Sequence, residues 1–135
     1  MFNSKFLRFF IVIAVISLAS SCAKKEKFTR QGWNEGDGLS FPRRNAMLDD
    51  LLATQKLKGL TYKQVVAFLH APQRNSRTDK SFHYEVIRKM SGIDTMYAKN
   101  LVFYLNNDSV VVNTKVTERD YIKEKKEREK KAKKK

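Results

Sequence analysis

The chain has 135 residues, a formal net charge of +14, one cysteine and two histidines. A single thiol excludes an intrachain disulfide and any metal site built from several cysteines. The excess of positive charge is typical of proteins with anionic partners, such as nucleic acid or a lipid surface.

Residues 1–22 have the pattern of an export signal. Lys5 and Arg8 precede an apolar run at 9–19, which is shorter than the roughly 20 residues that a membrane-spanning helix needs. The run leads into Leu18-Ala19-Ser20-Ser21-Cys22, which resembles the lipobox of bacterial lipoproteins. An ordinary signal peptide, or an uncleaved anchor with an incidental cysteine, is the alternative.

The lipobox resemblance implies a signal peptide at 1–21 and a lipidated Cys22. Two or three acyl chains on this residue would anchor the protein stably to a membrane. Ala23 is not the aspartate that retains some bacterial lipoproteins in the inner membrane. The outer membrane, with the domain facing the periplasm, is therefore the expected location.

Composition divides the rest of the chain into three parts. Residues 22–40 are expected to be the lipidated cysteine and a flexible tether, in which Trp33 docks on the domain or, alternatively, inserts at a headgroup interface. Residues 41–117 form one small domain, with little mass to spare for a large active site. Residues 118–135 form a basic charged tail.

Two helices are predicted at the start of the domain. The first begins near Phe41 and stops at Gly59, which suits a left-handed turn. The second begins at Thr61, whose side chain can form a capping box with Gln64, and it ends at Pro72.

Three strands follow, at 81–89, 99–106 and 109–117. Alternation places Phe82, Tyr84 and Val86 inward on the first strand, and Val110, Val112 and Val116 inward on the third. Consecutive strands pair most simply as an antiparallel meander, and the helices must cover one of its faces. The prediction is a two-layer α+β sandwich, an αα-hairpin packed on three strands.

These residues resemble the SmpA/OmlA (BamE-like) family. The resemblance rests on the turn Gly59-Leu60-Thr61, on Val65, Leu69 and Pro72, and on the hairpin Phe103-Tyr104-Leu105-Asn106-Asn107-Asp108. His70 stands where the family usually has glycine. The resemblance implies an ααβββ fold and an accessory role in the assembly of outer-membrane β-barrel proteins.

No catalytic constellation is predicted. His70 is expected at a helix end and His83 at an exposed sheet position, and neither has a carboxylate at metal-ligand spacing. The sequence has no phosphate-binding glycine loop and no serine elbow. We expect no enzyme activity, metal, cofactor or small-molecule substrate.

Two groups of apolar residues are candidate partner surfaces. Ile93, Met96 and Tyr97 lie in an expected loop at 90–97, where they could contact a partner or cover the end of the core. Val102, Tyr104 and Val111 are expected on the outer sheet face, where they would form an exposed patch with Ile87.

The tail is the most basic part of the chain. Residues 123–135 hold eight Lys and one Arg against three Glu, a composition too polar to bury a core. The candidate membrane-surface residues are Lys130, Lys131, Lys133, Lys134 and Lys135. Such a tail could bind anionic lipid, or remain solvated without function. Export would keep it away from nucleic acid.

The leading hypothesis is a lipid-anchored envelope protein that binds other proteins without catalysis, as an accessory of outer-membrane protein assembly or envelope integrity. The alternatives are an inhibitor-like periplasmic lipoprotein with another target, and a binder of anionic lipid or lipopolysaccharide through the tail.

Overall fold

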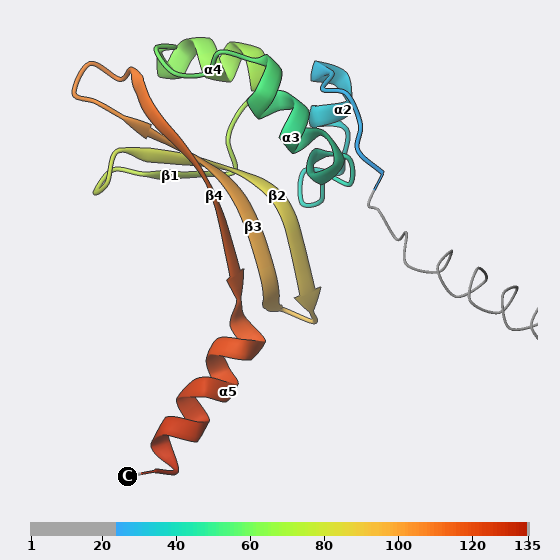
Figure 1. Ribbon diagram of the computed structural model, residues 1–135, viewed down its shortest axis with the longest axis vertical. Coiled ribbons are helices and arrows are strands. Elements are labelled where there is room, and N and C mark those ends of the chain that lie inside the picture. The colour runs from blue at the N-terminus through green and yellow to red at the C-terminus, as the bar shows by residue number, and fades with distance from the viewer. Residues whose placement is uncertain (1–23, 135) are drawn as a thin grey trace, which may run out of the picture.

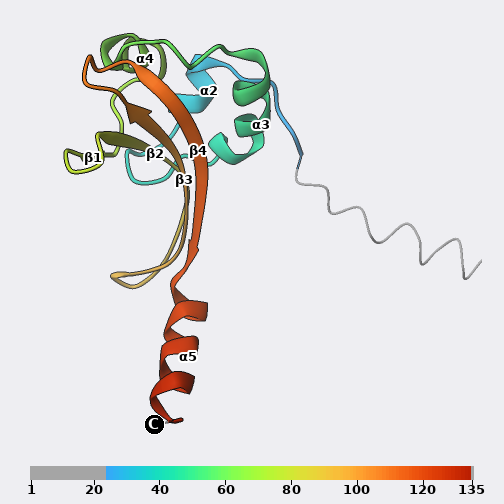
Figure 2. The same cartoon turned by 60° about the vertical axis from the view of Figure 1, so that its left-hand side comes forward.

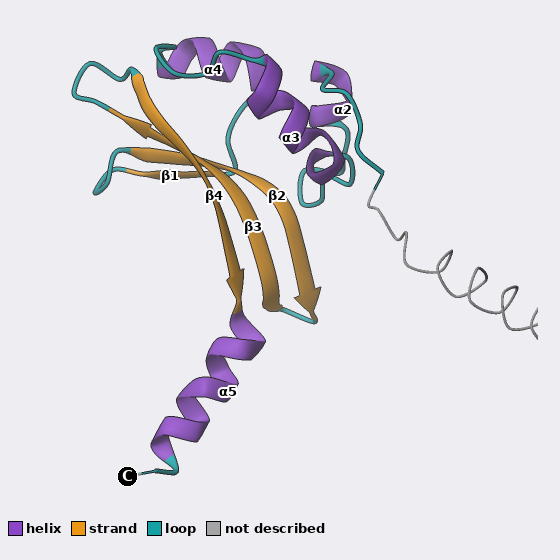
Figure 3. Cartoon of the chain, in the orientation of Figure 1, coloured by secondary structure: helices purple, strands orange, loops and turns teal. Residues whose placement is uncertain are grey.

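The computed structural model describes residues 24–134, so the predicted signal peptide, Cys22 and Lys135 lie outside it. The described chain is an α+β sandwich, with an antiparallel sheet in the order β1-β2-β3-β4 (Figures 1 and 3). The elements are α2 (Arg30–Asn34), α3 (Arg44–Thr54), α4 (Tyr62–Leu69), β1 (Arg74–Ser76), β2 (Ser81–Ser91), β3 (Asp94–Leu105), β4 (Val111–Asp120) and α5 (Tyr121–Ala132). β2, β3 and β4 pair as an antiparallel meander, but β1, α2 and α5 are additional, and α3 and α4 each pack against α2, so the predicted ααβββ arrangement is not confirmed.

Both predicted helices form, with different boundaries. The capping box of α4 is confirmed: Thr61 Oγ1 accepts from the Gln64 amide at 3.2 Å, and Gln64 Oε1 accepts from the Thr61 amide at 2.8 Å. The α3 helix begins only at Arg44 and ends at Thr54, earlier than predicted. Gly59 adopts a φ of 86°, so its conformational freedom serves the turn before α4 and not the end of α3.

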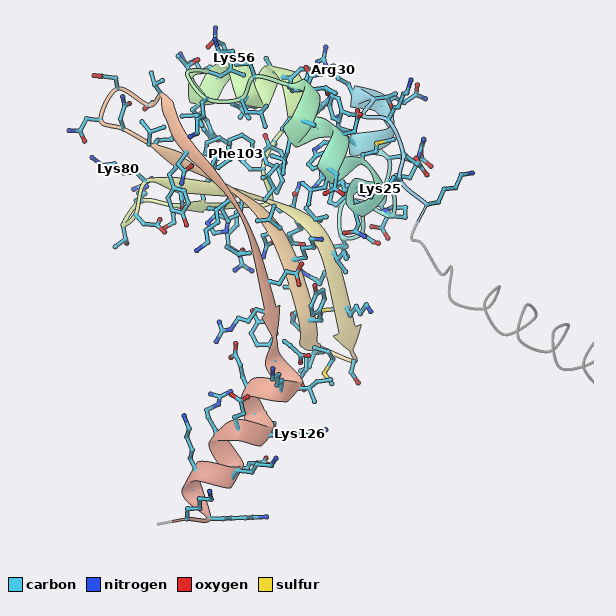
Figure 4. All side chains as sticks on the ribbon, viewed as in Figure 1. Lys25, Arg30, Lys56, Lys80, Phe103 and Lys126 are labelled. Atoms are coloured by element: carbon cyan, nitrogen blue, oxygen red, sulfur yellow. The ribbon has the colours of Figure 1, made fainter. Side chains whose placement is uncertain are left out.

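The core lies between the helices and one end of the sheet. Phe82 and Phe103 stack with ring centroids 4.8 Å apart, and Phe103 is seen in Figure 4 beneath the helical layer. The other members are also apolar and buried: Trp33, Met47, Leu48, Leu51, Leu57, Val65, Leu69, Tyr84, Val86, Leu101 and Val111. Phe82, Tyr84 and Val86 therefore face inward, as predicted.

Residues 26–34 are packed on the domain, so the prediction of a flexible tether at 22–40 is wrong for this part of it, whereas residues 35–40 are exposed. The Glu26 amide donates to the Ala46 carbonyl at 2.9 Å, and the Phe28 amide donates to Asp50 Oδ2 at 2.7 Å. Trp33 is 0% exposed. The docking of Trp33 on the domain was expected. Its buried ring attaches the surrounding polar segment to the core.

Arg44 is a charged residue inside this core, only 1% exposed. It donates to the carbonyls of Trp33 at 2.8 Å and Glu85 at 2.8 Å, and to Gln73 Oε1 at 2.7 Å. Its guanidinium also lies 3.5 Å from the Phe41 ring centroid. One side chain thus connects the N-terminal segment, α3 and β2.

Three register shifts interrupt the sheet, and two of them change which residues face the core. The register shifts between Glu85 and Ile87 on β2, and at Tyr104/Leu105 opposite β4, where Val112 is the additional residue. A bulge reverses the alternation of side chains beyond it. Ile87 therefore packs against the core, and Val112 is exposed, each opposite to its predicted orientation.

The two ends of the sheet differ in their cover. Figures 1 and 2 show α2, α3 and α4 gathered over one end, whereas the other end of β2, β3 and β4 has no helix on it. We call this uncovered end, residues 88–98 together with 119–132, the distal arm. It contains the β2–β3 hairpin and α5.

Residues 123–135 were predicted to be too polar to bury a core, and the described tail nevertheless forms the end of β4 and a helix. Residues 118–120 continue β4, and the next residues form α5, whose amide at Lys123 donates to Asp120 Oδ1 at 3.0 Å. Glu124 forms a two-pronged ion pair with Arg119, at 2.9 Å from Nε to Oε1. The helix buries no residue, so its cap and charge pairs stabilise it without a core.

Candidate functional site

The distal arm carries a surface groove. This groove, of about 790 Å³, runs between the β2–β3 hairpin and α5. The hairpin contributes Ser91, Asp94, Thr95 and Met96, and the helix contributes Tyr121, Ile122, Lys125, Lys126, Arg128 and Glu129. Its floor is thus partly apolar and its helical wall is basic.

The prediction of a loop at 90–97 is wrong. Residues 90–91 end β2 and residues 94–97 begin β3, and only Gly92 and Ile93 form the turn between the paired strands. Gly92 has a φ of 59°, as such tight turns require at this position. The turn leaves Ile93 at the tip of the arm, 95% exposed.

The three predicted contact residues of this segment lie in different surroundings, and Met96 is the additional residue of the register shift opposite Lys89 and Met90. Ile93 lies at the tip, and Met96 lines the groove. Tyr97 lies under the Lys89 ammonium, 5.7 Å from its ring centroid. Burial, followed by a hydrogen bond to Glu118, raises the pKa of Tyr97. The structure therefore brings Met96 to the groove and Ile93 near its end, while Tyr97 belongs to a polar surface.

The predicted outer-face patch does not exist as a continuous surface. Val111 is 2% exposed and belongs to the core, because the bulge at Val112 turns it inward. Val102 does lie on the face away from the helices, but it is also only 2% exposed, between His83 and Lys115 in neighbouring strands. Tyr104 alone remains partly exposed.

The lysines of α5 are distributed unequally around the helix. Lys123, Lys126 and Lys130 of α5, the C-cap Lys133 and Lys134 in the turn after it fall within an arc of about 100° when 3.6 residues per turn are continued past Ala132. We call these five residues the basic face. Glu124, Glu127 and Glu129 all lie outside the arc, and none of the ion pairs between described residues includes a basic-face lysine.

Three of the predicted membrane-surface residues, Lys130, Lys133 and Lys134, belong to the basic face. Lys131 points to another side of the helix, and Lys135 is outside the described residues. Sequence reasoning missed Lys123 and Lys126, together with Tyr121 and Ile122 of the groove. The signals were present in the spacing 123-126-130-133 and in the N-cap residue Asp120.

A polar cluster at the start of β2 has the residue types of a catalytic site. Ser81 Oγ lies 2.7 Å from Asp79 Oδ1 and 3.0 Å from His83 Nε2. Hydrogen bonds from Ser76 and Ser81 lower the pKa of Asp79. The hydroxyl of Ser81 therefore donates its one hydrogen bond to this carboxylate. His83 Nε2–H must then donate to Ser81, and an imidazole that donates cannot deprotonate the hydroxyl. The cluster closes a turn and does not activate a nucleophile.

This cluster gives a testable pH dependence. Burial, and then the charge of Arg74, lower the pKa of His83 below its ordinary value of 6.5, against the opposing effect of Asp79. Below pH 6.5 the unfolded chain therefore binds more protons than the folded one, and the free energy of unfolding falls as the pH decreases. NMR titration of the His83 ring should give a midpoint below 6.5. A midpoint at or above that value would contradict the assigned environment.

Two further features, a metal-binding cluster and a membrane-spanning helix, are absent from the described residues. No three His, Cys, Asp or Glu side chains within residues 24–134 are grouped to hold a metal ion. No helix in that part of the chain is both long and apolar enough to cross a membrane.

Three comparisons with known proteins gave no relative. No protein-family model matches the chain, and searches of curated proteins and of solved structures found no match either.

Proposed function

We propose that this protein is a lipid-anchored, non-catalytic binding module of the bacterial envelope, which recognises another envelope protein through the groove of its distal arm. The proposal rests on one observation: the groove combines the partly buried Met96 with Ile122, which is 40% exposed, on a sheet end that no other element covers. An uncovered apolar surface bordered by polar residues is a frequent property of protein-binding sites.

The anchor and the identity of the partner rest on sequence resemblance. The lipobox-like residues before Cys22 favour attachment to the outer membrane, with the domain in the periplasm. The motifs shared with the SmpA/OmlA family favour a component of the outer-membrane β-barrel assembly machinery as partner, and a BamE-like ααβββ arrangement within the larger sheet. The inhibitor-like alternative through the outer sheet face has less support, since Val102 and Val111 are buried.

Photo-crosslinking in the producing cell tests the proposal. A photoreactive residue at Met96 should crosslink to a barrel-assembly component. The same residue at Leu39, which is 73% exposed on the segment before α3, is the control and should not. Crosslinks to the same protein from both positions would show non-specific proximity. The absence of any crosslink from Met96 would contradict the role of the groove.

The anchor is tested separately. The Cys22→Ala variant should move from the membrane fraction to the soluble fraction, because lipid on this thiol is what holds the protein in the proposal. Continued membrane association of the variant after a wash with about 1 M NaCl, with the N-terminal segment still cleaved, would contradict the lipid anchor, because the wash removes contacts that depend on basic residues alone. The crosslinking experiment at Met96 decides the role of the groove in either case.

A further inference from the structure

The basic face of α5 is a second surface of the distal arm, which adjoins the groove and shares Lys126 with it. In the helical projection the groove residues Tyr121, Lys125 and Glu129 lie to one side of Ile122, and the basic-face lysines lie to the other. Figure 4 shows Lys126 directed away from the helix into solvent. Two neighbouring sides of one helix are thus available to two different partners.

We propose that the basic face of α5 binds the surface of an anionic lipid bilayer and thereby fixes how the groove is presented. Five lysines within one arc, without an intervening carboxylate, create a positive surface that complements a layer of phosphate headgroups. Each lysine near such a surface contributes about 1 kcal/mol, which corresponds to about a fivefold change in affinity.

The residues beside the lysines favour lipid over other polyanions. Ile122 is 40% exposed at the margin of the basic face, in line with Lys126 four residues later. An apolar side chain at this place gains free energy at a headgroup–acyl boundary, as in helices that lie in a membrane interface. A nucleic-acid backbone would offer it no comparable contact. In addition, an anchor at Cys22 would keep the helix close to a bilayer.

The test uses the full chain reconstituted into lipid vesicles, with an Ile122→Trp substitution as reporter. Trp33 is fully buried, so it provides a constant background. Vesicles of brominated phosphatidylcholine with about 30% phosphatidylserine, an anionic lipid, should quench the fluorescence of the reporter tryptophan. Vesicles of brominated phosphatidylcholine alone should not. About 1 M NaCl should abolish the quenching, because it shortens the Debye length to about 3 Å.

Two triple variants separate the basic face from net charge. Lys123→Gln, Lys130→Gln and Lys133→Gln together, none of which lines the groove, should weaken the contact about 100-fold and reduce quenching to the level of neutral vesicles. Lys125→Gln, Arg128→Gln and Lys131→Gln remove the same charge from the other sides of α5 and should retain it. Glutamine preserves helix propensity, and α5 buries no residue, so neither variant should unfold the domain.

Three results would overturn the proposal. Equal loss in the two triple variants would show a dependence on net charge alone. Equal quenching in neutral and anionic vesicles would show a contact without charge recognition. Binding of duplex DNA while the reporter tryptophan remains unquenched by anionic vesicles would assign the face to nucleic acid. None of these outcomes depends on the protein partner, so the groove proposal and this one can fail independently.

Discussion

Replacing Arg44 with methionine should lower the free energy of unfolding by about 3 kcal/mol, since buried groups deprived of their hydrogen-bond partner cost about 1–3 kcal/mol each. Methionine fills a similar volume but leaves the carbonyls of Trp33 and Glu85 and the Gln73 side chain without their donor. Burial lowers the pKa of Arg44 to about 10, so at neutral pH the donor is still charged and its bonds are of the stronger kind.

The neighbouring residue provides the control. Arg43 forms ion pairs with Glu26 at 2.8 Å and Glu35 at 3.0 Å, near the surface. Because surface ion pairs contribute little, Arg43→Met should cost about 0–1 kcal/mol. Urea denaturation followed by Trp33 fluorescence measures both. Equal losses of unfolding free energy in Arg44→Met and Arg43→Met would show that the hydrogen bonds of Arg44 do not stabilise the core.

Truncation of Trp33 to alanine should cost about 3–5 kcal/mol, the range for large aromatic residues in a core. The side chain is 0% exposed and makes edge contacts with Phe28 and Tyr84. Without it, residues 26–34 would lose their main apolar attachment to the domain.

Trp33→Phe should cost much less, about 1 kcal/mol, because Trp33 Nε1 is buried and has no hydrogen-bond partner among the described residues. Removal of an unsatisfied donor partly offsets the smaller ring. Urea denaturation followed by far-UV circular dichroism compares the variants, since the fluorescent residue is changed. If phenylalanine proves as destabilising as alanine, the indole N–H has a partner that the geometry does not indicate.

The local signals in the sequence predicted the helices and the sandwich well. Thr61 and Gln64 specify a cap through residues three apart, and Phe82, Tyr84 and Val86 specify a strand face by alternation. Such short-range patterns fix local geometry irrespective of what packs on it.

The errors came from features that local patterns do not encode. A bulge at Val112 reverses the face of a strand, and it depends on pairing with β3. The docking of 26–34 depends on a pocket formed by α3, α4 and β2. The helix α5 was not predicted, because residues 123–134 have no apolar face that would indicate one. Its N-cap and its charge pairs stabilise the helix instead. The groove, built from elements about 30 residues apart, could not be predicted for the same reason.

The joint between β4 and α5 has a geometric consequence. Asp120 is both the last residue of the strand and the N-cap of the helix, so no linker separates them. The Arg119–Glu124 pair spans the joint, and Arg119 lies 4.6 Å from the Tyr121 ring centroid. The direction in which α5 leaves the sheet therefore follows from the last residues of β4, and a change of backbone angles at this joint would reorient the whole helix relative to the domain.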